Sequence, residues 1–181
     1  MNDRDDAISI EPCPAARDAE AGAFLREVFY NELGFTPDPY LDKDFQSLCG
    51  HYRRGRGQIW IASENGCILA TTALLDLTLS RSVPASASPE ILELAMSGGD
   101  AELKRMFVAR KARGRGIGKR LLEVALTHAT ASGFERVVLD STRDMRVAID
   151  LYKAFGFEEI PDYNGNSRAD IFMALVLPGG S

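Results

Sequence analysis

Several residue types are scarce in this chain of 181 residues, which contains only two histidines and three cysteines. Cys13, Cys49 and Cys67 are odd in number and lack the paired spacing of metal ligands, so we expect reduced thiols and no metal site. The two histidines, His51 and His128, stand outside any G-x-S-x-G context, which argues against a zinc site or a Ser-His-Asp triad. We interpret both as surface or helix-face residues.

Long apolar runs and an excess of positive charge are also missing. No run approaches the roughly 18 apolar residues that span a membrane, and the acidic start MNDRDD does not resemble a secretory or transit peptide. We therefore expect a cytoplasmic protein with no membrane partner. Because 21 Lys and Arg oppose 26 Asp and Glu, for a net charge of -5, a nucleic-acid partner is not expected. The 45% hydrophobic and 26% charged fractions are typical of a globular protein, which predicts one domain over residues 1–181 with a frayed end at 178–181.

The most informative stretch runs from Ala101 to Ser132. The apolar segment Leu103 to Ala109 predicts a buried strand, and a basic, glycine-rich loop follows from Arg110 to Gly118. An amphipathic helix comes next, with an apolar face at three- and four-residue steps formed by Ile117, Leu121, Val124 and His128. A strand, a glycine loop and a helix in this order gather free backbone N–H groups at a helix N-terminus, where anions and phosphates bind.

Positive charge is concentrated in the same stretch. Between Glu102 and Arg120 there are eight cations and one acid, a net of +7: Lys104, Arg105, Arg110, Lys111, Arg113, Arg115, Lys119 and Arg120 against Glu102. An acidic protein with this local excess is suited to a phosphorylated ligand. The alternative is a solvated basic loop at the start of an ordinary helix.

Three segments of this region resemble one known family. The spacing Arg113-x-x-Gly116-x-Gly118 is similar to the R/Q-x-x-G-x-G/A acyl-CoA-binding motif of the GNAT superfamily of N-acetyltransferases. Two further segments match the same family in the same order, ELKRMFV at 102–108 and the Leu-Tyr-x-x-x-Gly-Phe pattern at 151–157. The resemblance covers roughly residues 58–177.

The resemblance implies an α/β fold with a GNAT-like mixed, mostly antiparallel central sheet flanked by helices. It also implies direct transfer of an acetyl group from acetyl-CoA to a primary amine of a small molecule or peptide, within a ternary complex and without a metal. The alternative function is a catalytically silent CoA-binding sensor or interaction module of the same fold. A homodimer is compatible with the resemblance, which does not identify the acceptor amine.

The resemblance assigns ten residues to binding of the co-substrate. The backbone of the β-strand would pair with the pantetheine arm, and the N–H groups of the loop would hold the pyrophosphate. The residues are Met106, Phe107, Val108, Arg113, Gly114, Arg115, Gly116, Ile117, Gly118 and Lys119.

The resemblance also names two catalytic candidates. Glu102 matches an acid that can take the proton from the acceptor ammonium, directly or through water; the alternative is a structural partner for a neighbouring arginine. Regular alternation places Glu102 on one face with Lys104 and Met106, unless a β-bulge reverses the assignment. Tyr152 matches a tyrosine near the CoA sulfur that can protonate the departing thiolate; the alternative is a core aromatic residue.

The remaining pattern predicts the order β-α-α-β-β-β-α-β-α-β-β. Two helices precede the sheet hairpin, one after Pro14 and one with Leu41, Phe45, Leu48 and Tyr52 on its apolar face. Asn65-Gly66 predicts a tight hairpin between strands at 58–63 and 67–77. Short strands are expected at 7–11, 136–140, 157–160 and 171–177, with a helix whose face includes Ala148, Leu151, Tyr152 and Phe155.

Some segments permit more than one interpretation. Residues 80–100 form a possible inserted loop, which would serve as a flap, a dimer contact or neither. The acids Asp38, Asp42 and Asp44 either face a cationic acceptor or form a solvated surface. The tetrapeptide Arg54 to Gly57 repeats the later Arg-Gly-Arg-Gly but precedes a strand, so we interpret it as a loop and not as an RNA-binding patch. Six residues are further candidates for the acceptor site: Asp140, Ser141, Thr142, Tyr163, Asn164 and Arg168.

Overall fold

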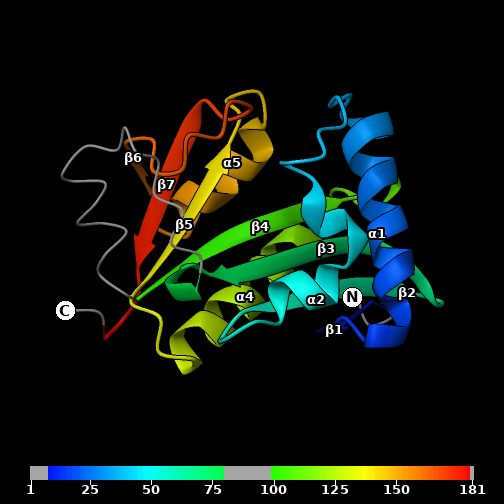
Figure 1. Ribbon diagram of the computed structural model, residues 1–181, viewed down its shortest axis with the longest axis horizontal. Helices are drawn as coiled ribbons and strands as arrows, with labels where there is room; N and C mark the ends of the chain where they lie inside the picture. Colours follow the sequence, from blue (N-terminus) through cyan, green and yellow to red (C-terminus); the bar gives the residue numbers. More distant parts are fainter. Residues whose placement is uncertain (1–7, 80–98, 180–181) are drawn as a thin grey trace. The chain divides into compact units, whose positions relative to one another are not determined.

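A computed structural model describes residues 8–79 and 99–179 of the chain. The seven strands form one sheet in the hydrogen-bonding order β1-β2-β3-β4-β5-β7-β6. The strands are β1 Ser9–Pro12, β2 Gln58–Glu64, β3 Cys67–Asp76, β4 Asp100–Val108, β5 Arg136–Ser141, β6 Glu158–Ile160 and β7 Ile171–Val176. Within the described ranges, the predicted order of elements and the mixed, mostly antiparallel sheet are confirmed (Figure 1).

The helical segments follow the predicted order. The α-helices are α1 Asp18–Arg26, α2 Leu48–Tyr52, α4 Ile117–Ala131 and α5 Arg146–Ala154. Shorter helical turns are η1 Ala15–Arg17, η2 Glu27–Glu32, η3 Lys43–Gln46, η4 Leu77–Leu79 and η5 Arg110–Ala112. None of the helices in the described ranges combines the length and apolar character that a membrane crossing needs. The possible insertion at 80–100 lies almost wholly outside the described residues.

The chain divides into two compact units. Unit 1 comprises Met1–Leu75 and Arg105–Ala125, and unit 2 comprises Asp76–Lys104 and Leu126–Ser181. Unit 1 therefore contains β1, β2, most of β3, the second half of β4 and the start of α4. Unit 2 contains the first half of β4 with β5, α5, β6 and β7.

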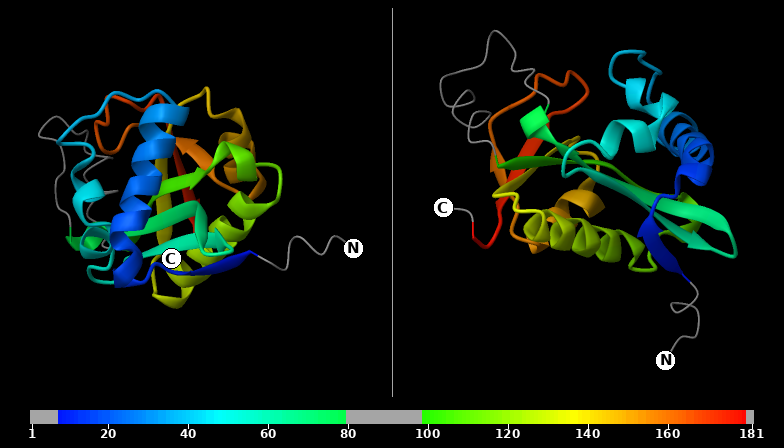
Figure 2. Two further views of the ribbon diagram at one scale, coloured as in Figure 1. Left: turned by 90° about the vertical axis from the view of Figure 1, so that its right-hand side faces the viewer. Right: turned by 60° about the horizontal axis from the view of Figure 1, so that its bottom comes forward.

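The core of unit 1 lies between the first helices and the β2–β3 hairpin. Ala21, Leu25, Val28 and Phe29 recur along α1 and η2 at three- and four-residue steps and are buried. Of these, Ala21, Leu25 and Phe29 pack with residues of α2 and with Ile59, Ile61 and Ala73 from one face of the hairpin. Within this unit the two views of Figure 2 show α4 on the opposite face of the hairpin from α1 and α2. Each buried Leu, Ile or Phe side chain contributes about 1.5–3 kcal/mol by leaving water.

The β2–β3 hairpin turns where the sequence predicted. Asn65 and Gly66 have φ values of 50° and 79°, the pair of left-handed residues that a tight two-residue turn requires. The strands pair antiparallel from Gln58 opposite Leu74 to Glu64 opposite Cys67, with one irregularity between Ala62 and Ser63.

The prediction of one continuous second helix was wrong. The helical conformation is interrupted at Ser47, whose φ of -157° and ψ of 97° are extended, so η3 and α2 are separate helices. The Ser47 hydroxyl accepts a hydrogen bond from Gly50 N at 3.2 Å and donates one to Asp18 of α1 at 2.9 Å. A serine N-cap of this kind satisfies a free helical N–H group and favours a new helix start over continuation. Leu41, expected on the apolar face, is exposed.

The sheet of unit 2 combines one parallel pair with antiparallel neighbours. Strand β4 pairs parallel with β5 from Asp100 opposite Arg136 to Glu102 opposite Val138. β5 pairs antiparallel with β7 along its whole length, and β7 pairs with β6. The pairing of β4 with β5 ends at Glu102, although both strands continue beyond it. The polar side chains described below lie at this end of the pairing.

For two adjacent threonines in the middle of β3, we expect substitution by valine to have opposite effects on stability. Thr71 Oγ1 donates to the Arg105 carbonyl at 2.8 Å, whereas Thr72 Oγ1 is buried with no partner among the residues that the structure describes. Thr72→Val should raise the free energy of unfolding by about 1 kcal/mol, because it removes an unsatisfied hydroxyl while keeping the shape. Thr71→Val should lower it by about 1 kcal/mol, because it removes a hydrogen bond. Urea unfolding of the two variants and the wild type measures both, and destabilisation by both substitutions would contradict the assignment.

Candidate functional site

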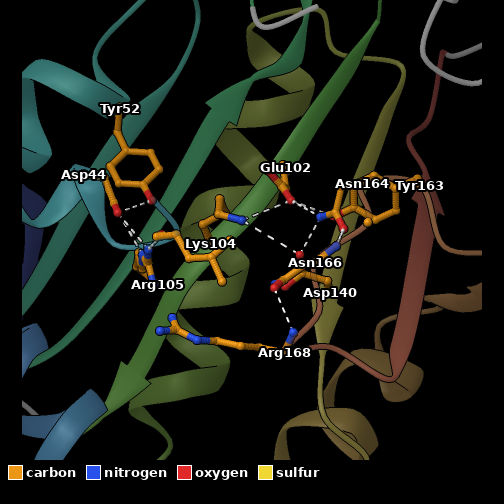
Figure 3. Close-up of polar contacts among 12 residues, drawn as sticks. Asp44, Tyr52, Glu102, Lys104, Arg105, Asp140, Tyr163, Asn164, Asn166 and Arg168 are labelled. Carbon is orange, nitrogen blue, oxygen red and sulfur yellow. Dashed lines mark hydrogen bonds and ion pairs between the residues drawn. The ribbon is translucent and has the colours of Figure 1, made fainter. Parts of the chain in front are cut away.

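A polar cluster in unit 2 begins where the pairing of β4 and β5 ends. Glu102 Oε1 accepts three hydrogen bonds, from Lys104 Nζ at 3.2 Å, Tyr163 Oη at 2.8 Å and Asn164 Nδ2 at 3.0 Å (Figure 3). The amide of Asn164 also donates to Asp140 Oδ2 at 2.5 Å, and Lys104 Nζ lies 3.9 Å from the same oxygen. Two carboxylates, one ammonium and two neutral donors thus form one network.

The two oxygens of Glu102 differ in their surroundings. Oε1 receives all three bonds, whereas Oε2 accepts none from the residues in the described ranges. Glu102 is 5% exposed, so its side chain has a fixed orientation and one oxygen with uncommitted lone pairs. A carboxylate held in this way can accept a proton from an acceptor amine or from a bridging water.

The loop after β6 supplies the neutral donors of the cluster. Asp162 Oδ1 accepts from the N–H groups of Asn164 and Gly165 at 3.0 and 2.7 Å, and Asn164 Oδ1 accepts from Asn166 N at 3.0 Å. These side chain–backbone bonds define a tight turn and fix the orientation of the Asn164 amide. Burial raises the pKa of Tyr163 well above its usual value, and the negative charges of Glu102 and Asp140 add to this effect. Tyr163 therefore remains a neutral donor.

The predicted Tyr152 lies in α5 of the same unit. It is buried and packs against Phe157 with ring centroids 5.7 Å apart. Burial raises its pKa, and the charge of Asp140 raises it further, so the side chain is a neutral phenol throughout the neutral range. Packing in the core and action as a proton donor are therefore compatible roles for this residue.

A second buried cluster lies in unit 1 around Arg105. The guanidinium donates to both carboxylate oxygens of Asp44, at 2.8 and 2.7 Å, and to the Leu41 carbonyl at 2.8 Å. Tyr52 Oη donates to Asp44 at 2.6 Å (Figure 3). The Phe45 ring centroid lies 4.4 Å from the guanidinium carbon. Asp42 accepts a hydrogen bond from Tyr30 Oη at 2.9 Å and lies 3.7 Å from the same guanidinium. Both acids are buried in these contacts, which excludes a solvated acidic surface for Asp42 and Asp44.

Arg105 also has an unusual backbone conformation. Its φ of 54° is in the left-handed region, which a residue with a side chain adopts at a cost of about 1–3 kcal/mol. Thr71 Oγ1 holds its carbonyl and Asp44 holds its guanidinium, so contacts at both ends stabilise this conformation. The contact between Lys104 and Glu102 agrees with the predicted alternation, and the departure from a regular strand comes one residue later.

The predicted anion loop lies in unit 1 and precedes a helix, as expected. Gly114 and Gly116 have φ values of 77° and 75°. The first helical hydrogen bond joins Arg120 N to Gly116 O at 3.1 Å, so the N–H groups of Ile117, Gly118 and Lys119 come before it and have no partner within the helix. The loop therefore leaves backbone N–H donors grouped at the N-terminus of α4, as an anion site requires.

The sequence suggested one basic patch at this loop, but arginines of the loop are paired with acidic side chains. Arg115 donates to both oxygens of Glu64, at 2.7 and 3.2 Å, and Arg113 donates to Glu32 at 3.3 Å and to the Val108 carbonyl at 3.0 Å. Lys104 and Arg105, counted in the same patch, pair with Glu102 and Asp44 instead. The sequence could not show the arginine pairs, because each acid lies at least 51 residues from the arginine that it neutralises. Only Lys104 has its partner, Glu102, nearby in the chain.

The structure brings some predicted residues together and reveals others. Tyr163, Asn164 and Asp140 contact Glu102 or share its donors, whereas no hydrogen bond joins Ser141, Thr142 or Arg168 to Glu102 within the described ranges. Lys104 was not predicted as a site residue, although its two-residue spacing from Glu102 was a usable signal. The Arg105–Asp44 pair had no signal beyond the presence of the acids.

The buried ion pair predicts a strong dependence of stability on Asp44. Burial alone would raise the pKa of Asp44, but the Arg105 guanidinium outweighs this and lowers it. The pair's contribution is thus present at neutral pH and is lost as the pH falls through the lowered pKa of the folded state. Asp44→Asn should lower the free energy of unfolding at pH 7 by about 3–5 kcal/mol, because it leaves a buried guanidinium without a counter-charge.

Tyr52→Phe is the matched control, because it removes a neutral donor to the same carboxylate and should cost about 1–2 kcal/mol. Urea unfolding at pH 7 and at acidic pH measures both variants. The ionic role would be contradicted if the two variants lost equal free energy of unfolding. It would also be contradicted if the free energy of unfolding of the wild type fell no more steeply with acid than that of Asp44→Asn.

Comparison with known proteins shows consistent similarity. A family model described as the acetyltransferase (GNAT) family matches residues 25–157. The uncharacterized N-acetyltransferase YjgM of Escherichia coli K12 is 30% identical over 135 residues, which are 73% of this chain and 67% of that protein. N-acetyltransferase family 8 member 2 of Rattus norvegicus is 27% identical over 139 residues, 77% of this chain and 55% of that protein.

Shorter matches and solved structures agree. The IAA acetyltransferase of Azospirillum brasilense is 42% identical over 82 residues, 44% of this chain and 54% of that protein. Across the first relatives the match spans as little as 36% of the other protein's length. A GNAT-family acetyltransferase structure from Staphylococcus aureus Mu50 superposes with a TM-score of 0.76 at 22% identity, covering 95% of this chain and all of that one. The Salmonella typhimurium protein yncA, solved with its cofactor acetyl-CoA, superposes with a TM-score of 0.64 at 17% identity, over 96% and 95% of the two chains.

Proposed function

The chain belongs to the GNAT acetyltransferase family, and on that premise we propose that it transfers an acetyl group from acetyl-CoA to a primary amine. The acceptor is a small molecule or a peptide, and the transfer is direct, within a ternary complex. The observation that carries this proposal is the pair of left-handed glycines, Gly114 and Gly116, directly before the 15-residue helix α4. Several relatives are named N-acetyltransferases, which supports the same reaction.

The residues of the loop fit a pyrophosphate. The free N–H groups of Ile117, Gly118 and Lys119 and the N–H groups of the left-handed turn supply donors, and the dipole of α4 favours negative charge. The side chains of Arg113 and Arg115 bond Glu32 and Glu64, so their contribution to the site is mainly to shape the loop. Lys111 and Lys119 are exposed and are the lysines best placed to add charge.

The second half of β4 binds the pantetheine arm. Backbone groups of Met106, Phe107 and Val108 pair with the amides of the arm as an added strand would. The Val108 carbonyl already accepts a hydrogen bond from Arg113. Acetyl-CoA, when bound, supplies the acetyl carbon and a thiolate as leaving group.

Two side chains move protons in this proposal. Glu102 takes a proton from the acceptor ammonium at Oε2, the oxygen without a protein donor in the described ranges, so that the amine can attack. Tyr152 donates the proton that the departing thiolate needs, because its raised pKa keeps the phenol protonated. Thus one group removes a proton from the nucleophile and the other protonates the leaving group.

The proposal is tested by thermal shifts with CoA, acetyl-CoA and ATP in parallel, followed by thiol release over a panel of amines. We expect stabilisation by the two CoA species over ATP and amine-dependent release of thiol. Stabilisation by CoA without release on any amine would favour a silent CoA-binding module. No preference for CoA over ATP would contradict the assignment of the loop.

Two glycine variants separate the shape of the loop from close approach of the ligand. Gly116→Ala should weaken CoA binding about 5- to 30-fold, because a left-handed alanine costs about 1–2 kcal/mol. Gly118 is in the helix without a positive φ, so Gly118→Ala should stabilise the fold by up to about 1 kcal/mol. If Gly118→Ala also weakens binding, the ligand approaches that backbone closely. Calorimetric titration with CoA measures both, and unchanged binding by both variants would refute the site.

Tyr152→Phe isolates the proton donor. We expect kcat for thiol release to fall by about 10²-fold or more, with the thermal shift by CoA unchanged, because the substitution removes only the hydroxyl. Phe157→Leu is the control for packing around the same ring. If Tyr152→Phe retains full kcat, the residue is a core aromatic and not a general acid.

A further inference from the structure

Glu32, at the end of η2, contacts the segment that connects the strand assigned to pantetheine with the loop assigned to pyrophosphate. Its carboxylate accepts the backbone N–H of Arg110, at 2.9 Å to Oε2 and 3.3 Å to Oε1, and a guanidinium N–H of Arg113 at 3.3 Å. Its own carbonyl accepts from the Arg110 side chain at 3.3 Å. One residue thus contacts two positions that lie 78 and 81 residues later in the chain.

The backbone N–H that Glu32 accepts begins the short turn η5. Ala112 N and Arg113 N donate within the turn, to the carbonyls of Ala109 and Arg110 at 2.8 and 3.3 Å. The N–H of Arg110 precedes these bonds and has no acceptor within the turn itself. Glu32 supplies that acceptor, and a carboxylate is a strong partner for an N–H group. The side chains of Glu32 and Arg113 are 22% and 46% exposed, so water screens their ionic contact and the bond to the backbone is the main component.

The contacts of Glu32 restrain the junction between the two halves of the proposed co-substrate site. Arg113 also donates to the Val108 carbonyl at 3.0 Å, at the end of the strand half. The next residue, Gly114, is the first left-handed glycine of the loop half. By holding Arg110 and Arg113, Glu32 limits how far one half can shift against the other. A ligand that spans both halves needs a fixed spacing between them, whereas a ligand that contacts one half does not.

The turn that carries Glu32 also packs against the strand half. Phe29 of η2 contacts Phe107, with ring centroids 5.5 Å apart. η2 is a π-helical turn with a hydrogen bond from Leu33 N to the Val28 carbonyl at 3.0 Å, a rare conformation that is frequent at functional sites. One turn therefore holds the strand through an apolar contact and the start of the loop through a polar contact.

We propose that Glu32 is a positioning residue for the co-substrate: by holding Arg110 and Arg113, it fixes the spacing between the strand that takes the pantetheine arm and the loop that takes the pyrophosphate. The inference rests on the proposed function, because it requires acetyl-CoA as the ligand of both halves. Glu32 acts without touching the ligand. Its negative charge opposes a phosphate nearby, so a purely electrostatic role would make CoA bind more tightly once the charge is removed. The positioning role predicts weaker binding.

The test compares a ligand that spans the site with ligands that occupy one half. Glu32→Ala should weaken CoA binding about tenfold, because loss of a hydrogen bond to a charged group lowers the population of the binding arrangement by about that factor. Pantetheine, which reaches only the strand, and inorganic pyrophosphate, which reaches only the loop, should each bind within about twofold of their wild-type affinity. Calorimetric titration measures CoA, and NMR titration measures the two weaker ligands. Retained binding of the fragments also shows that the variant is folded.

Two further variants provide the controls. Glu32→Gln keeps an oxygen that accepts the Arg110 N–H, so its affinity for CoA should stay within about threefold of the wild type. Glu27→Ala removes the same charge from an exposed position of η2, where the carboxylate accepts from Asn31 at 2.7 Å, and should leave all three affinities unchanged. Tighter CoA binding by Glu32→Ala and Glu32→Gln would overturn the proposal in favour of electrostatic opposition. Equal losses for CoA and pyrophosphate would overturn it by showing that Glu32 shapes the loop alone.

Hydrogen exchange of the Arg110 amide, measured without ligand, tests the restraint itself. The amide should exchange at least about tenfold faster in Glu32→Ala than in the wild type, because its acceptor is removed. Exchange at the wild-type rate would refute the inference even if CoA binds. Binding of CoA to the wild type with the same affinity in Glu32→Ala would refute this inference alone. Absence of CoA binding by the wild type would instead refute the proposed function, and this inference with it.

Discussion

The backbone of β4 at Arg105 is the constraint on which the conformation of this strand depends. Its left-handed φ of 54° is unfavourable for a residue with a side chain and persists because both ends of the residue are held. The Thr71 hydroxyl donates to the carbonyl, and Asp44 accepts two hydrogen bonds from the guanidinium in a buried, bidentate pair. A buried ion pair contributes little net stability compared with an apolar substitute. Its value here is that it specifies one conformation of the strand.

Different contacts flank Arg105 on its two sides in the strand. Before it, Glu102 and Lys104 share a face of the strand and join the polar network of unit 2. After it, Phe107 packs against Phe29 in the core of unit 1, with ring centroids 5.5 Å apart. The backbone of Met106 to Val108 follows directly, and this is the segment that we assign to the pantetheine arm. In the proposed function, this strand would supply both the proton acceptor, Glu102, and the backbone that pairs with the co-substrate.

Much of this could be predicted from local sequence signals. The Asn65-Gly66 turn and the glycine loop before α4 depend on conformations that few residues other than Asn and Gly adopt, so sequence alone identifies them. The break at Ser47 was missed because the apolar spacing on either side continued through it, although a serine N-cap favours a new helix start. The pairing of Arg105 with Asp44, and of Arg115 with Glu64, could not be predicted. Residue type and spacing do not reveal which acid a distant arginine will meet in the folded chain.

The tetrapeptide Arg-Gly-Arg-Gly occurs at 54–57 and again at 113–116, and only the second copy precedes a helix. In hydrogen–deuterium exchange with and without CoA, the first copy therefore serves as the internal control for the second. The account predicts slower exchange of the amides from Gly114 to Lys119 when CoA is added, with no change at Arg54 to Gly57, because only the second copy adjoins free N–H groups of a helix N-terminus. Equal protection of both copies would indicate general attraction of an anion to arginine. Protection of neither would contradict the assignment of the loop as the CoA site.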